Sequence, residues 1–138
     1  MSAPAAGTAV PPFEQPITAD LMMAYGAATW DWHRMHYDGD YVRALGLPGP
    51  MLDGQAQGAF FARAVMDWLG PRAFICRLSF QMRAMIFPGD TIRCEGVVRG
   101  VSEEDGAALI TLDQTINVGE RLAGKAETEV LLRDPADG

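Results

Sequence analysis

The feature that most constrains the fold is a change in the spacing of apolar residues at Gly70-Pro71. From Gly54 to Leu69 apolar residues recur every three or four positions, which predicts one long amphipathic helix. After residue 71 apolar and polar residues alternate, which is typical of strands with one buried and one solvated face. The alternation divides into four runs, which cover about residues 76–84, 92–101, 110–118 and 125–132.

These elements predict an α+β fold in which a curved antiparallel sheet wraps around one long central helix. Each predicted strand is apolar on one face only, and the helix at Gly54–Leu69 is the one element able to cover those faces. Shorter helices are expected at about residues 19–28 and 41–45, and a short strand near residues 10–13. An open sheet exposes its edge strands, so pairing of two edges predicts assembly into at least a dimer.

The length of 138 residues fits one domain. We expect this domain over residues 16–134, preceded by a flexible N-terminal arm at residues 1–15, because the first dozen residues are rich in Ala and Pro. The start has neither the basic nor the apolar region of a signal peptide. Charged and amide residues interrupt the most apolar stretch, Met51–Leu69, so it cannot span a bilayer. The sequence therefore predicts a cytoplasmic protein with no membrane contact.

The balance of charges is acidic, with 11 Lys and Arg residues against 18 Asp and Glu residues and a net charge of −7. Such a chain lacks the basic surface that follows a phosphate backbone, which argues against a nucleic-acid partner. Attraction to an anionic membrane is disfavoured for the same reason. Cys76 and Cys94 are too few for a disulfide framework or a four-cysteine zinc site, and both are expected to be reduced core residues.

Reactive side chains are densest between Thr29 and Asp38, where both histidines of the chain lie. A turn between Asp31 and His36 would bring a carboxylate and an imidazole to one water molecule, the pairing that general acid–base chemistry needs. Spacing alone leaves two alternatives open. The segment is also read as a solvated turn with a capping Asp, which the spacing alone favours. His33 and His36 with one neighbouring Asp also approximate a two-histidine, one-carboxylate metal site, but the spacing matches no strong metal motif and no metal is expected.

The run Asp31–His36 resembles the D-x-N-P-x-H motif of the MaoC-like dehydratases, hot-dog enzymes that include the (R)-specific enoyl-CoA hydratases. The following segment, Tyr37–Gly46, resembles the next helix of that family, and Pro48–Gly54 resembles its P-x-x-x-H-G entry to the central helix. Pro88-Gly89-Asp90 is similar to its P-G-D turn. These matches follow the order of the family from about residue 16 to residue 132, so the resemblance implies a hot-dog fold.

The chain also departs from the family pattern. His33 and Arg34 stand where the family has Asn and Pro, and Asp53 replaces the usual His before the central helix. The first helical turn, at residues 55–59, carries no serine where some members use a hydroxyl. The segment at residues 67–71 and the aspartates after the motif resemble a narrower group, the small catalytic subunit of steroid side-chain enoyl-CoA hydratases.

The resemblance implies hydration of a 2-enoyl-CoA thioester to the 3-hydroxyacyl-CoA, or the reverse dehydration. In this reading Asp31 and His36 transfer protons through one water, with either residue as the base. The backbone N–H of Gly54, at the positive end of the central helix, stabilises the enolate oxygen. No cofactor is expected, because CoA is part of the substrate.

Further expectations concern the substrate and the partners. Arg83 alternates with the apolar residues of its predicted strand, so it is expected on the solvated face and in contact with the CoA. Phe60 and Met51 are expected to contact the acyl group. That group is a short chain, a medium chain or a steroid side chain. The partner is expected to be a second copy or another hot-dog subunit. Two alternative functions remain: a hot-dog thioesterase in which Asp53 attacks the carbonyl or activates water, and a non-catalytic subunit that shapes the acyl tunnel of a heteromeric hydratase.

Overall fold

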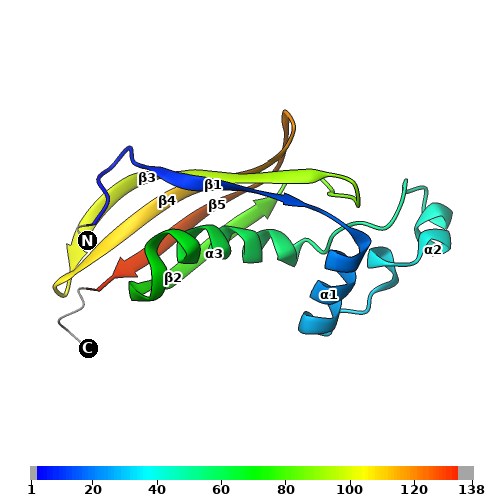
Figure 1. Cartoon of the computed structure of the whole chain (residues 1–138), viewed down its shortest axis with the longest axis horizontal. Coiled ribbons are helices and arrows are strands. Elements are labelled where there is room, and N and C mark those ends of the chain that lie inside the picture. Colours follow the sequence, from blue (N-terminus) through cyan, green and yellow to red (C-terminus); the bar gives the residue numbers. More distant parts are fainter. Residues whose placement is uncertain (1–2, 134–138) are drawn as a thin grey trace.

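The computed structural model describes residues 3–133 and contains one antiparallel sheet curved around one long helix (Figure 1). The sheet has the order β1-β3-β4-β5-β2, which leaves β1 and β2 as its two edges. The elements are β1 (Ala9–Pro16), α1 (Ala19–Thr29), the 3₁₀ turn η1 (Arg34–His36), α2 (Gly39–Ala44), α3 (Gln55–Leu69), the 3₁₀ turn η2 (Gly70–Arg72), β2 (Ala73–Met82), β3 (Thr91–Glu104), β4 (Ala107–Val118) and β5 (Arg121–Leu132). The predicted hot-dog arrangement of a curved sheet around a central helix is confirmed.

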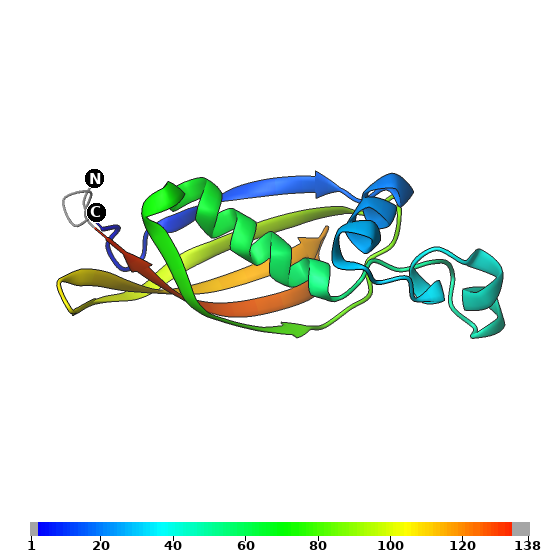
Figure 2. The same cartoon turned by 90° about the horizontal axis from the view of Figure 1, so that it is seen from below.

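Helix α3 lies along the concave face of the sheet, as the view from below shows (Figure 2). Its apolar stripe supplies Phe61, Ala64 and Val65 to the core, and all three are fully or almost fully buried. They pack in one cluster with residues of the inner sheet face, namely Ile92, Cys94, Val98, Ile110, Leu112, Ile116 and Val130. Burial of each large apolar side chain contributes about 1.5–3 kcal/mol, so the contact between α3 and the sheet is the main source of stability.

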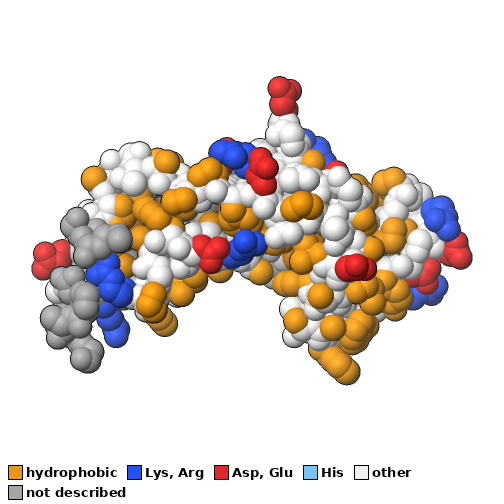
Figure 3. All heavy atoms as spheres, viewed as in Figure 1, with side chains coloured by type: hydrophobic (Ala, Val, Ile, Leu, Met, Phe, Trp, Pro, Cys, Tyr) orange, Lys and Arg blue, Asp and Glu red, His pale blue; other side chains and the backbone are white. Residues whose placement is uncertain are grey.

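The segment between β1 and α3 projects beyond the end of the sheet and carries α1, η1 and α2 (Figures 1 and 2). Thr18 caps α1 by accepting a hydrogen bond from the Leu21 N–H at 3.1 Å. Asp38 caps α2 in the same way through the Tyr41 N–H at 3.0 Å. We call this segment, residues 18–53, the overhang. Hydrophobic side chains gather on the surface of α1 in the overhang (Figure 3).

The N-terminal arm expected at residues 1–15 is wrong for residues 9–15. These residues form most of β1, which pairs antiparallel with β3 from Ala9 opposite Val97 to Pro16 opposite Thr91. Prolines disfavour a central strand because they lack an N–H, but an edge strand tolerates them. Here the register shifts between Val10 and Phe13, across the two adjacent prolines. Residues 1–2 of the expected arm, and the expected last domain residue 134, lie outside the described residues.

The side chains of β2 also face the core in a different pattern from the predicted alternation. Cys76, expected in the core, is exposed, whereas Cys94 is buried as expected. The cause is a bulge in β2 between Ile75 and Arg77, which shifts the side chains that follow by one position. Burial raises the pKa of the Cys94 thiol to about 12.

Among residues 3–133, no helix is both long and apolar enough to cross a membrane.

Candidate functional site

The loop after α1 fixes the position of Asp31. Trp30 ends the helix in the left-handed region, with φ of 59°, and the Asp31 N–H donates back to the Gly26 carbonyl at 3.0 Å. A Cβ on Gly26 would lie 2.9 Å from the Asp31 carbonyl oxygen, so the chain can fold back this closely only against glycine. The sequence of α1 thus sets where the carboxylate lies.

The Asp31 carboxylate is held in its ionised form. Its Oδ1 accepts a hydrogen bond from the His33 N–H at 3.0 Å, and this bond is the largest cause of a pKa for Asp31 below the ordinary value. Partial desolvation acts in the opposite direction, while contact with Asp53 and the neighbouring imidazole of His36 lower the pKa of Asp31 further. The carboxylate therefore remains a hydrogen-bond acceptor at neutral pH.

His36 lies at the end of η1 and is oriented by the chain that leads into α3. Its Nδ1 is 2.8 Å from the Met51 carbonyl oxygen, and the Met51 N–H donates to the Met35 carbonyl at 3.0 Å. A carbonyl only accepts, so Nδ1 carries the hydrogen and the lone pair of the neutral ring is on Nε2. That Nε2 is 3.7 Å from the Asp31 Oδ2. This separation exceeds a direct hydrogen bond, so one water can bind both atoms.

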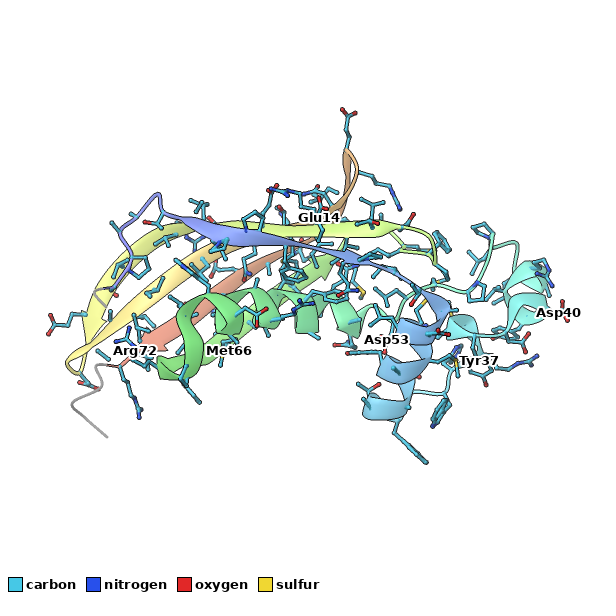
Figure 4. All side chains as sticks on the ribbon, in the orientation of Figure 1. Glu14, Tyr37, Asp40, Asp53, Met66 and Arg72 are labelled. Atoms are coloured by element: carbon cyan, nitrogen blue, oxygen red, sulfur yellow. The ribbon has the colours of Figure 1, made fainter. Side chains whose placement is uncertain are left out.

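A third titratable group, the carboxylate of Asp53, joins this pair at the entrance to α3. The donor atoms of Asp31, His36 and Asp53 all lie within 4.8 Å of one another. Figure 4 shows Asp53 between α3 and α1. Its Oδ1 accepts a hydrogen bond from the Gln55 N–H at 2.8 Å, so the side chain caps the helix as well as approaching the pair.

Gly54 precedes the first turn of α3. In the part of the chain that the structure describes, no acceptor pairs with its N–H. The positive end of the helix dipole adds to this free donor, which makes the position favourable for a developing negative charge. A Cβ on Gly54 would collide with the Met82 Sδ, so this position accepts only glycine without rearrangement.

One cavity of about 270 Å³ is lined by both His36 and Gly54. It lies between the start of α3, the end of β2 and the segment that follows β2, and its wall is mostly apolar. The lining residues are His36, Met51, Leu52, Gly54, Gln57, Met82, Arg83, Ala84, Met85 and Ile86.

The structure places four of the six predicted site residues at this cavity: His36, Gly54, Met51 and Arg83. Asp31 is brought to its edge by the contact with His36.

Phe60 lies elsewhere and is not part of the cavity wall. It is six residues after Gly54 along the helix, and its ring packs 6.2 Å from that of Phe13 on β1. The expected contact between Phe60 and the acyl group is therefore not supported.

Two residues at the site were not singled out as members of it. The sequence predicted a role for Asp53 only in the thioesterase alternative. The fact that Asp53 replaces the usual His of the family before the helix was the signal that could have placed it at the site. Gln57 is almost completely buried and lines the cavity, and a glutamine in a helix of this length carries no signal of that kind.

The metal alternative takes a different form from the one that the spacing suggested. His33 is turned away, because its Nδ1 accepts from the Met35 N–H at 3.2 Å, and Asp38 pairs with Arg34 at 2.7 Å. The donor set that lies close enough to hold an ion is instead Asp31, His36 and Asp53.

A curved antiparallel sheet around a central helix defines the hot-dog class of proteins. The structure is similar to protein af1124 from Archaeoglobus fulgidus, with a TM-score of 0.85, 21% identity and coverage of 96% of this chain and 81% of the other. It is also similar to the (R)-hydratase from A. caviae involved in PHA biosynthesis, with a TM-score of 0.83, 20% identity and coverage of 96% and 100%.

A third similar structure is the ChsH1-ChsH2 complex from Mycobacterium tuberculosis, with a TM-score of 0.79, 21% identity and coverage of 93% of this chain and 98% of the other. At these identities the likeness shows the fold. The family model for the MaoC like domain matches residues 3–119, and the chain belongs to that family. No curated protein matches the chain in sequence.

Proposed function

We propose that this protein adds water to a 2-enoyl-CoA thioester to form the 3-hydroxyacyl-CoA, or catalyses the reverse dehydration. The observation that carries the proposal is the geometry of three groups at one cavity. The Nε2 of His36 lies 3.7 Å from the Asp31 carboxylate, and the cavity that His36 lines also contains the start of α3 at Gly54. Membership of the MaoC-like family supports a hydratase or dehydratase role.

The resting hydrogen bonds support a separate role for each group in this proposal. His36 holds its hydrogen on Nδ1 against the Met51 carbonyl, so Nε2 is free to accept a proton from the bound water. As that O–H bond breaks, the water oxygen bonds to C3 and the C2=C3 electrons move to the thioester oxygen. The Gly54 N–H stabilises this enolate. The imidazolium then returns the proton to C2, and the adjacent Asp31 carboxylate stabilises the imidazolium charge in between.

The assay that tests this proposal separates it from thioester cleavage. With crotonyl-CoA or a longer enoyl-CoA, hydration removes the enoyl absorbance and leaves the thioester intact. The position of Asp53 beside Asp31 and His36 favours the thioesterase as the second candidate, since a carboxylate there can attack a carbonyl or activate water. That reaction releases free CoA thiol. Release of free thiol without formation of the 3-hydroxyacyl-CoA would replace the first proposal by the second.

CoA binding is assigned to Arg83. Its guanidinium is exposed at the cavity, where its Nη2 donates to the Gln81 Oε1 at 2.7 Å, and a cation there suits a phosphate of CoA. We expect Arg83→Ala to raise KM for an enoyl-CoA several-fold and to leave kcat nearly unchanged. Arg77→Ala is the matched control, because Arg77 lies on β2, the strand that ends just before Arg83, and away from the cavity. An unchanged KM in Arg83→Ala would show that CoA binds elsewhere.

The proposed assembly is a homodimer or a hetero-oligomer with another hot-dog subunit. Two similar structures are those of complexes, ChsH1-ChsH2 and HadBC, both from Mycobacterium tuberculosis. A CoA thioester substrate suits the cytoplasmic location expected from the sequence. If the chain shapes the tunnel of a partner instead, an Asp31→Asn/His36→Gln variant would leave the activity of the mixed complex unchanged. Loss of that activity would place the catalytic site on this chain.

A further inference from the structure

Gln57, in the first turns of α3, is a buried amide without a partner. The residue is 3% exposed, and its Oε1 makes no hydrogen bond. Its Nε2 donates no hydrogen bond to any of the described residues 3–133 either. Burying an amide without a hydrogen bond costs about 1–3 kcal/mol in proteins, so nearly all such groups have a partner.

The same core shows how a structural glutamine is held. Gln114, on β4, is 1% exposed, its Nε2 donates to the Phe61 carbonyl at 3.1 Å, and its Oε1 accepts from the Thr128 hydroxyl at 2.7 Å. Both ends of that amide are satisfied between α3 and the sheet. Gln57 lies at the same interface without either bond, so its polar group does not serve the packing.

The position of Gln57 directs its amide toward the reacting groups. Side chains on a helix lean toward the N-terminus, and residues three apart share a face, so Gln57 extends toward Gly54. Both residues line the cavity that also contains His36. Gly124 on β5 makes room for the amide, because a Cβ there would collide with the Gln57 Oε1. With Oε1 fully buried, Nε2 is the atom left for a ligand in the cavity.

We propose that the Gln57 Nε2 donates a hydrogen bond to the thioester oxygen, beside the Gly54 N–H. The two donors form one oxyanion site, with one supplied by the backbone and one by a side chain. This inference rests on the proposed hydration, because it assigns a further catalytic residue to that site. Asp53 is not needed as the second donor, because its Oδ1 already accepts a hydrogen bond from the Gln55 N–H at 2.8 Å.

The test replaces the amide by an apolar side chain of the same length. Gln57→Met should lower kcat for enoyl-CoA hydration by about 100- to 1,000-fold, with a much smaller change in KM. Gln57→Glu keeps the shape but removes the donor at neutral pH, and should lose at least as much. Gln55→Met is the matched control, because Gln55 lies exposed on the same helical turn, and it should keep the wild-type kcat.

A structural role would give a different result. Replacing an unpartnered buried amide by Met should leave the melting temperature unchanged or raise it, whereas loss of a packing role would lower it. The inference is overturned if the wild type hydrates enoyl-CoA and the folded Gln57→Met and Gln57→Glu variants keep a near-normal kcat. That result would leave the proposed function intact.

If the wild type hydrates no enoyl-CoA, the proposed function is wrong. The role of Gln57 is then tested by measuring the binding of a CoA ligand. Acetoacetyl-CoA is the probe, because its enolate presents a negative oxygen at the thioester. Gln57→Met should bind it about 10-fold more weakly than the wild type or Gln55→Met do. Equal dissociation constants, or no binding by the wild type, would overturn the inference.

Discussion

Asp31 and His36 are held by backbone groups rather than by neighbouring side chains. The His33 N–H binds the carboxylate at 3.0 Å, and the Met51 carbonyl binds the imidazole at 2.8 Å. Backbone groups of two separate segments therefore set the distance between the two functional atoms. Substitution of either residue should remove its chemistry while leaving the position of the other unchanged.

We expect Asp31→Asn and His36→Gln each to lower kcat by about 100- to 10,000-fold. Because both groups act on one water, the double variant should be little worse than the worse single variant. Steady-state kinetics with crotonyl-CoA measures the three values. The melting temperature of Asp31→Asn should change little, since Asn keeps an oxygen for the His33 N–H. Near-normal kcat in His36→Gln would contradict the assignment.

The His33 N–H offers a direct test of what lowers the pKa of Asp31. The φ angle of His33 is −64°, which matches proline, so His33→Pro removes the N–H with little strain in its own backbone. Loss of a donor to the ionised form destabilises the carboxylate, and the pKa of Asp31 should therefore rise. Carbon NMR of the carboxyl group during an acid titration measures this shift.

His33→Asn is the control, because it restores the family residue and keeps the N–H. It should change the pKa of Asp31 far less than His33→Pro does, because the imidazole of His33 is the smallest cause of the lowered pKa and the His33 N–H the largest. It should also be tolerated in the hydration assay. If His33→Asn were more damaging than His36→Gln, the functional imidazole would be that of His33.

At the scale of elements, the close approach of three strands depends on Gly96 of β3. A Cβ there would lie 2.8 Å from the Asp113 carbonyl oxygen and 2.9 Å from the Gln114 Cγ. Gly96→Ala should lower the free energy of unfolding by about 1–3 kcal/mol, because backbone atoms cannot shift as a flexible side chain can. Chemical denaturation measures the change.

Gly100→Ala is the control on the same strand, because a Cβ at Gly100 meets nothing within 4 Å. This variant should be neutral, or more stable by about 0.4–1 kcal/mol through the lower entropy of the unfolded chain. Equal stability of the Gly96 and Gly100 variants would show that β3 and β4 can separate without cost.

At the scale of the whole molecule, both sheet edges are open. Within the described residues 3–133, β1 pairs only with β3, and β2 pairs only with β5. Phe74 on β2 is 61% exposed, which adds an apolar side chain to that edge. Light scattering at micromolar concentration should therefore give at least a dimer. A fully active compact monomer would contradict this expectation.

The sequence predicted those features that depend on neighbouring residues. The periodicity of residues 54–69 reflects one helix face, and the structure places α3 at Gln55–Leu69. The four later strands also appear near their predicted positions, because alternation is set by the backbone of each strand alone. The motif at Asp31–His36 was found through its resemblance to a family, since spacing by itself favoured a solvated turn.

Only the tertiary structure decided what joins that motif. Asp53 and Gln57 reach the site because the Leu52 N–H binds the Ile86 carbonyl at 2.8 Å and fixes the entrance of α3 against a segment far along the chain. The bulge that exposes Cys76 and the addition of β1 to the sheet arise from pairing between strands. Local patterns carry no information on such pairing, because its free energy depends on residues that meet only after the chain has folded.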